Sequence, residues 1–193
     1  MERGGWVMWP LLVLSIVSIA LILERSWFWF RNRQPINNGS ALKMAHALRE
    51  GKMWNAAALA DKDQTIYGRV VKGIITLGCS ESVGLEVIEN ERRRIERFMV
   101  VLSTIITASP LLGILGTVSG IIRSFHFLSG TDVVTDPRLV SAGIAEALLT
   151  TAFGLIVALV TLFPYMVFRA QVDRCLGRLE AIVAAAEAGR CEE

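Results

Sequence analysis

Glu146 is the residue whose type and position could most clearly do chemistry. It stands at the leading edge of a run, 147–168, that contains no charged residue. An ionised carboxylate is costly at depth in a membrane, so acids in such runs typically pair with another group or mark an ion or proton path. An acid also suits the start of a helix, and Ser141 and Gly143 lie just before it. On these residues alone, a proton-path carboxylate and a helix start at the outer interface remain equal alternatives.

Small and weakly polar residues recur at helical spacing in two apolar stretches. In the earlier stretch they follow steps of three and four: Ser103, Thr107, Pro110, Gly113, Thr117, Gly120 and Ser124. The later stretch repeats the pattern with Thr151, Gly154, Ala158 and Thr161. Small residues let helix backbones approach closely, and Gly116 and Gly120 have the spacing of a helix-packing motif. The same stripes could line a narrow, nearly dry pore. Four positions are therefore candidates for packing or for pore lining: Gly113, Gly120, Gly154 and Ala158.

Helical geometry separates Glu146 from the threonine five residues later. At about 100° per residue, Thr151 lies about 140° around the helix from Glu146, whereas Thr150 lies only about 40° away. We therefore expect that Glu146 and Thr151 do not share one wall of a regular helix. One of them would face a pore and the other a neighbouring subunit.

Three long uncharged runs must position these residues: 6–23, 98–122 and 147–168. Each is long enough to cross a hydrocarbon core of ~30 Å as a helix. The first run could be a signal peptide, but no small-residue cleavage site follows it, and Trp6, Trp9 and the aromatics at 27–30 flank it like interfacial belts. Pro110 and Pro164 lie inside the other two runs, where a membrane helix tolerates proline.

The composition agrees with a membrane protein and excludes several other classes. Hydrophobic residues make up 53% of the 193 residues, and the 20% that are charged cluster in 24–97 and 169–193. A net charge of +2 offers no basic field for nucleic acid. Three scattered cysteines suit neither a disulfide framework nor a metal site. The usual catalytic motifs are absent from the sequence, so we expect no enzyme and no cofactor.

The predicted fold is an all-α membrane protein with three transmembrane helices, with long helices extending into the cytoplasm, that oligomerises around a central pore. We divide the chain into a first span with a periplasmic amino terminus (1–30), a cytoplasmic helical segment (31–97), a second span (98–122), a periplasmic link (123–143), a third span (144–168) and a cytoplasmic helical tail (169–193). The orientation follows from Lys and Arg, which are abundant in 31–97 and just after the third span.

The two predicted cytoplasmic parts read as helices. We expect breaks near Gly51, Gly68 and Gly84 within 41–97. No Pro or Gly separates Arg92 from Phe98, so the helix before the second span is predicted to continue into it. The tail carries a narrow apolar stripe, which predicts one helix from the third span to Gly189. The stripe comprises Val172, Leu176, Leu179, Val183 and Ala186.

Two stretches of this sequence resemble the signature stretches of the ExbB/TolQ/MotA proton-channel family. They are SPLLGILGTVSGIIRSF at 109–125 and SAGIAEALLTTAFGLIVALVTLFPYMVF at 141–168. The match is closest to the ExbB branch, and 10–29 resembles the first span of that branch. The paired motifs with the correct gap are highly specific, whereas 31–90 is the least diagnostic part.

The resemblance implies properties that spacing alone does not. Family members form pentamers around an apolar pore that holds the helices of a dimeric ExbD-like partner, and a TonB-like protein carries the energy to the outer membrane. The family's threonine in the second span matches Thr117 in GTVSG, and its acid and threonine in the third span match Glu146 and Thr151. These three residues become the candidates for a proton pathway.

The leading functional hypothesis is therefore an inner-membrane, multi-pass subunit of a proton channel that energises TonB-dependent transport. A TolQ-like role in envelope integrity is the alternative within the family. A non-conducting structural scaffold, in which the small-residue stripes only pack helices and Glu146 only starts one, is the alternative from another class.

Overall fold

The computed structural model describes residues 6–36, 39–128 and 137–190, and its described parts are helices joined by short connections. Three of the helices, within Met8–Arg31, Met99–His126 and Ser141–Gly189, are long and apolar enough to cross a membrane. The prediction of an all-α fold with three such helices is confirmed. In chain order, the helices are α1 (Met8–Ile36), α2 (Ser40–Arg49), α3 (Met53–Lys62), α4 (Ile66–Leu77), α5 (Glu81–Ile95), α6 (Met99–Leu128) and α7 (Pro137–Arg190).

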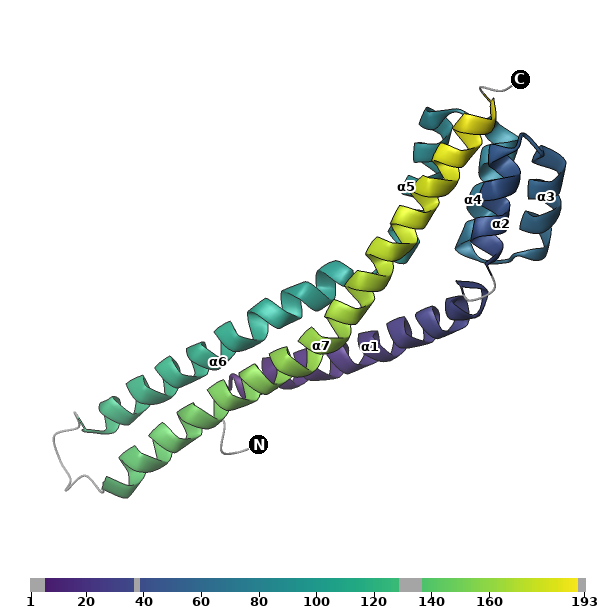
Figure 1. The fold of residues 1–193 in the computed structure, drawn as a ribbon. Helices are drawn as coiled ribbons and strands as arrows, with labels where there is room; N and C mark the ends of the chain where they lie inside the picture. Colours follow the sequence, from purple (N-terminus) through teal and green to yellow (C-terminus); the bar gives the residue numbers. More distant parts are fainter. Residues whose placement is uncertain (1–5, 37–38, 129–136, 191–193) are drawn as a thin grey trace. The chain divides into compact units, whose positions relative to one another are not determined.

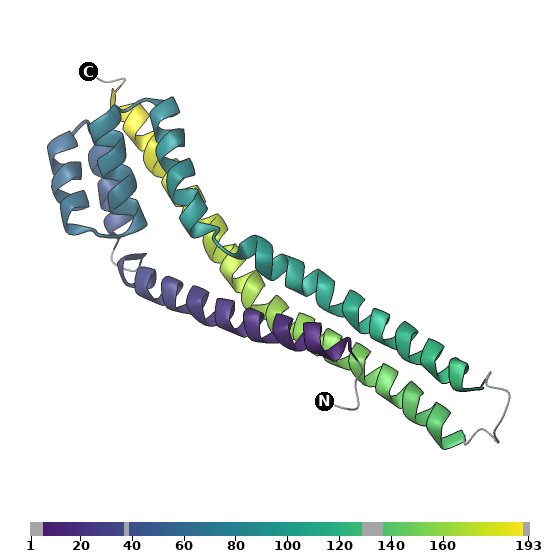
Figure 2. The ribbon, with the colours of Figure 1, turned by 180° about the vertical axis from the view of Figure 1, so that it is seen from behind.

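The chain forms two compact units, each built from separate stretches of sequence. The first unit comprises Met1–Leu23 and Phe98–Val167, and the second comprises Glu24–Arg97 and Phe168–Glu193. In the first unit, α6 and the earlier part of α7 lie side by side (Figures 1 and 2). A buried hydrogen bond of 2.6 Å between the hydroxyls of Ser18 and Thr161 ties α1 to α7. Thr161 donates its own proton to the Val157 carbonyl, so Ser18 is the donor to Thr161.

The second unit packs α2, α3 and α4 together and sets α5 along the later part of α7 (Figures 1 and 2). The α7 helix continues without a break to Arg190, which confirms the predicted single helix to within one residue. The tail residues Val172, Leu179 and Val183 are buried as the stripe requires. Cys175 and Ile182 are buried beside them, so the apolar face is wider than the predicted stripe.

The helix breaks inside the second unit differ from the predicted ones at two of three glycines. Gly51 does end α2, with a φ of 67°. Gly68 lies inside α4 and Gly84 lies inside α5. A Cβ on Gly68 would collide with the Asp63 carbonyl, and one on Gly84 with the Val183 side chain. These two glycines serve close packing instead of turns.

The actual breaks have their own local causes. The connection from α3 to α4 is fixed by the Asp63 carboxylate, which accepts hydrogen bonds from the backbone N–H of Thr65 at 2.9 Å and from its hydroxyl at 2.5 Å. Gly78 ends α4 in a backbone conformation, φ 111°, that side chains rarely adopt. The Ser80 hydroxyl then accepts from the backbone N–H of Val83 and caps α5.

The predicted continuous helix from Arg92 into the second span is wrong. The α5 helix ends at Ile95, and Phe98 takes a left-handed conformation with φ 67° before α6 begins. Arg25, which is 2% exposed, donates to the carbonyls of Arg94 and Ile95, each at 3.3 Å. The last carbonyls of a helix lack partners within it, so this buried guanidinium stabilises the end of α5.

Candidate functional site

Glycines bring α6 and α7 of the first unit into backbone contact. A Cβ on Gly154 would lie 2.5 Å from the Ser109 carbonyl oxygen and 3.2 Å from the Cα of Gly113. A Cβ on Gly120 would lie 2.6 Å from that of Ala147. These distances leave no room for larger residues, so the small-residue positions Gly113, Gly120 and Gly154 pack the two helices.

The predicted α6 stripe therefore divides into two parts. Gly113 and Ser124 are buried, as is Ala158 on α7, whereas Thr107 is exposed. The Thr107 hydroxyl donates to carbonyls of its own helix, at 3.0 Å to Thr104 and at 3.3 Å to Ser103. The contact face of α6 includes Ser109 and Gly116, which the predicted stripe left out.

Thr117 and Thr151, the two threonines of the predicted pathway, meet between α6 and α7. The Thr151 hydroxyl donates to the Gly113 carbonyl at 2.8 Å, and its oxygen lies 3.5 Å from that of Thr117. Thr117 donates to the Ile114 carbonyl of its own helix at 2.7 Å. Both side chains are partly exposed, so a hydroxyl pair joins the two helices at a place that solvent or a partner can reach.

Glu146 lies at a separate, smaller site. Its side chain is 27% exposed and faces a pocket of about 10 Å³, which is room for about one water molecule. Thr150 lines the same pocket, in agreement with the helical geometry that sets Thr150 near Glu146 and Thr151 away from it. Trp6 and Val7, at the start of the first span, complete the lining with residues of α6.

Arg123 is the pocket residue that the sequence analysis missed. Its Nη1 atom lies 3.9 Å from Oε1 of Glu146. Arg123 is the first residue of the predicted link 123–143 and was not singled out there. A signal was present, because Gly116, Gly120 and Arg123 follow each other at steps of four and three, which places them on one face of a helix.

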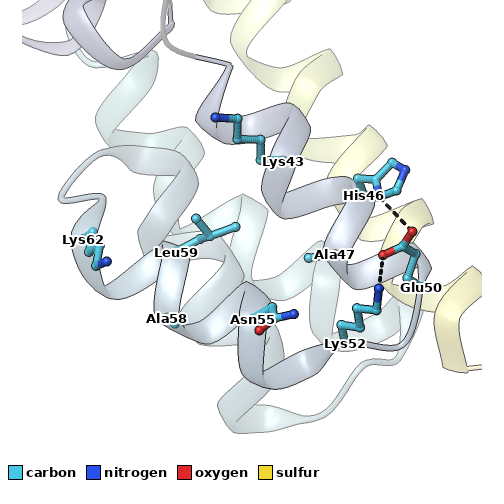
Figure 3. A pocket seen from close by; sticks show the side chains of 9 residues that line it. All are labelled: Lys43, His46, Ala47, Glu50, Lys52, Asn55, Ala58, Leu59 and Lys62. Carbon is cyan, nitrogen blue, oxygen red and sulfur yellow. Dashed lines mark ion pairs between the residues drawn. The ribbon is translucent and has the colours of Figure 1, made fainter.

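The second unit contains an open groove of about 450 Å³ between α2 and α3 (Figure 3). Its one acid, Glu50, lies between two basic groups. Glu50 pairs with Lys52 at 2.9 Å and with His46 at 3.3 Å. The hydrogen bond from Lys52, with the nearby His46, lowers the pKa of the Glu50 carboxyl. This groove is a solvated surface, whereas Glu146 stands in an apolar helix, so the candidate site lies in the first unit.

The three long apolar helices define a multi-pass membrane protein. Its candidate site is a carboxylate that lies among these helices, beside a pocket of the size of a water molecule. The chain belongs to the MotA/TolQ/ExbB proton channel family, whose model matches residues 80–181. That match contains Thr117, Glu146 and Thr151, so the resemblance drawn from the two motifs is confirmed.

Individual relatives carry ExbB or TolQ names. The chain is 34% identical over 175 residues to the putative biopolymer transport protein ExbB-like 3 of Synechocystis, a match that covers 86% of this chain and 81% of that protein. It is 26% identical over 190 residues to the biopolymer transport protein exbB1 of Vibrio cholerae, covering 93% and 82%. The Tol-Pal system protein TolQ of Pseudomonas aeruginosa is 37% identical over 91 residues, covering 47% and 39%.

Proposed function

We propose that this chain is an ExbB-like, non-enzymatic subunit of an inner-membrane proton channel. With an ExbD-like partner, it would use the proton motive force to energise TonB-dependent transport across the outer membrane. The amino terminus would be periplasmic and the carboxyl terminus cytoplasmic. Five copies would surround a pore that holds the partner's helices.

The observation that carries this proposal is the surroundings of Glu146. Glu146 lies among apolar helices, next to a pocket that holds about one water molecule. A carboxyl group in such a place can serve as a proton-binding group. Each proton that crosses 100 mV supplies about 2.3 kcal/mol. A few protons per step therefore suffice to shift an assembly between two arrangements.

Thr117 and Thr151 are proposed as hydroxyls near the proton path. Each already donates to a backbone carbonyl, but each oxygen can still accept a hydrogen bond. Water or a partner side chain could therefore bond to this exposed pair. The glycines around them would keep α6 and α7 close enough for the two oxygens to stay 3.5 Å apart.

A TolQ-like role in envelope integrity is the second candidate, favoured by the likeness to the TolQ protein. Both roles use the same kind of site, so they differ in partners. A non-conducting scaffold is the alternative of another class. The close glycine contacts between α6 and α7 would serve that scaffold equally well, but it gives no role to the pocket beside Glu146.

The test is complementation of strains that lack either the ExbB or the TolQ subunit, each supplied with this chain and its ExbD-like partner. We expect energised uptake to be restored in the first strain and lost again with Glu146→Gln. Glu180→Gln is the matched control, because Glu180 is an exposed acid on the same helix. Normal uptake with Glu146→Gln would refute the role of Glu146, and restored envelope integrity alone would favour the TolQ-like role.

Subunit number needs a separate measurement. Native mass spectrometry of the complex extracted with its partner should show five copies of this chain and fewer copies of the partner. A monomer or dimer that ignores the partner would leave no enclosed pore, and the scaffold would become the better account.

A further inference from the structure

Arg123 and Glu146 bring opposite charges together at one end of the paired helices. The two residues lie within the α6 and α7 stretches that could cross a membrane, and Nη1 of Arg123 is 3.9 Å from Oε1 of Glu146. Ionisable residues in such stretches are rare, and they usually pair with one another. The arginine side chain is 50% exposed and the glutamate 27%, so the acid is the more enclosed partner.

The packing of α6 on α7 sets this pairing. Gly120 rests against Ala147, the residue after Glu146, and Gly116 rests against Thr150. Arg123 follows Gly120 by three residues, on the same face of α6. The contact between Gly120 and Ala147 therefore fixes the register at which the guanidinium reaches the carboxylate.

The pair is close without being in direct hydrogen-bond contact. A charge-assisted hydrogen bond between these groups would measure about 2.7–2.9 Å, which is clearly shorter than the observed 3.9 Å. The adjoining pocket has room for about one water and is lined by Ser119 as well as by both charged residues. The Glu146 carboxylate is therefore next to both the Arg123 guanidinium and a pocket that holds about one water.

We propose that Arg123 is the positioning counter-ion of Glu146. It holds the carboxylate in place at the pocket, so whatever reaches Glu146 through the pocket also meets the guanidinium. That the pair gates proton uptake rests on the proposed function. The pairing itself concerns two residues of this chain, and it can be tested without proton flow.

A hydrophobic carbodiimide provides the test, because it reacts with the protonated form of a carboxyl group in apolar surroundings. The full-length protein would be labelled in detergent, and the modification of Glu146 would be followed by mass spectrometry over time. Removing a cation close to a carboxylate favours the protonated form. Arg123→Gln is therefore expected to raise the labelling rate of Glu146 above that of the wild type, whereas Arg123→Lys stays near the wild-type rate.

Two controls make the readout specific. Arg174→Gln removes an exposed arginine elsewhere on α7 and should leave Glu146 labelling unchanged. Glu180 is an exposed acid on the same helix, so its labelling should stay low in every sample, and a rise there would reveal a general change of the protein. Equal Glu146 labelling in wild type, Arg123→Gln and Arg123→Lys would overturn the inference.

A folding defect in Arg123→Gln would call for a second variant, Arg123→Gln with Glu146→Gln. A counter-ion role predicts that the double variant folds better than the single one, because the unpaired carboxylate is gone. A double variant as defective as the single one would overturn the inference. Labelling that follows the prediction while Glu146→Gln leaves uptake intact would refute the proposed function alone. Uptake that requires Glu146, with labelling indifferent to Arg123, would refute only the counter-ion role.

Discussion

The close contact between α6 and α7 predicts that one added methyl group at Gly154 strongly lowers the free energy of unfolding. In Gly154→Ala, the new Cβ would lie 2.5 Å from the Ser109 carbonyl oxygen, and real Cβ atoms essentially never approach closer than 3.0 Å. The Ser109 carbonyl and the nearby Gly113 are both backbone groups of α6 and cannot rotate away. The two helices must therefore separate by about half an ångström. Such overpacking typically costs about 1–3 kcal/mol, and separation would also weaken the bond from Thr151 to the Gly113 carbonyl.

The matched control is Gly177→Ala, also in α7. Among the described residues, nothing outside its own stretch of helix lies within 4 Å of the position where its Cβ would be, and alanine favours a helix over glycine by up to about 1 kcal/mol. Reversible unfolding in mixed micelles measures both free energies. We expect Gly154→Ala to lower the free energy of unfolding by about 1–3 kcal/mol and Gly177→Ala to leave it equal or raise it. A Gly154→Ala protein as stable as Gly177→Ala would refute the close-packing account of α6 and α7.

Three further predictions concern stability. Burial raises the pKa of the Tyr67 hydroxyl well above its usual range, so the unfolded state releases this proton first. The free energy of unfolding should then fall above pH ~10, by at most about 1.4 kcal/mol per pH unit. Tyr67→Phe should flatten this alkaline limb in a pH series of unfolding curves, and an unchanged limb would contradict the assignment. Arg25→Met should lower the free energy of unfolding by about 1–3 kcal/mol, because two carbonyls of α5 lose their donor. Equal melting temperatures of the variant and the wild type would contradict this prediction. Ser18→Ala and Thr161→Val should show a coupling of about 0.6 kcal/mol in a double-mutant cycle, and strict additivity would mean that their hydrogen bond contributes nothing.

The long spans were predictable because a long uncharged run can satisfy its own backbone hydrogen bonds within a membrane only as a helix. Helical geometry also separated Glu146 from Thr151 correctly, since it needs only a regular helix. The meeting of Thr117 with Thr151 was not predictable from spacing, because it depends on the register of α6 against α7. Only the family resemblance singled out this pair together.

The errors in the helix boundaries share a physical cause. A glycine permits a turn and a close approach equally well, so Gly68 and Gly84 looked like Gly51 in the sequence while serving packing. The break before α6 occurs at Phe98, a residue type that rarely takes a left-handed conformation. The stabilising group, Arg25, comes from a distant part of the sequence.

Proton flux through reconstituted complexes tests the central claim most directly. The chain and its ExbD-like partner would be placed in liposomes with a pH-sensitive dye inside, and a potassium gradient with valinomycin would impose the membrane potential. The account predicts flux with the wild-type chain and with Glu180→Gln, and flux at the level of empty liposomes with Glu146→Gln in a complex of unchanged subunit composition. Equal flux with Glu146→Gln and with the wild-type chain would contradict the account.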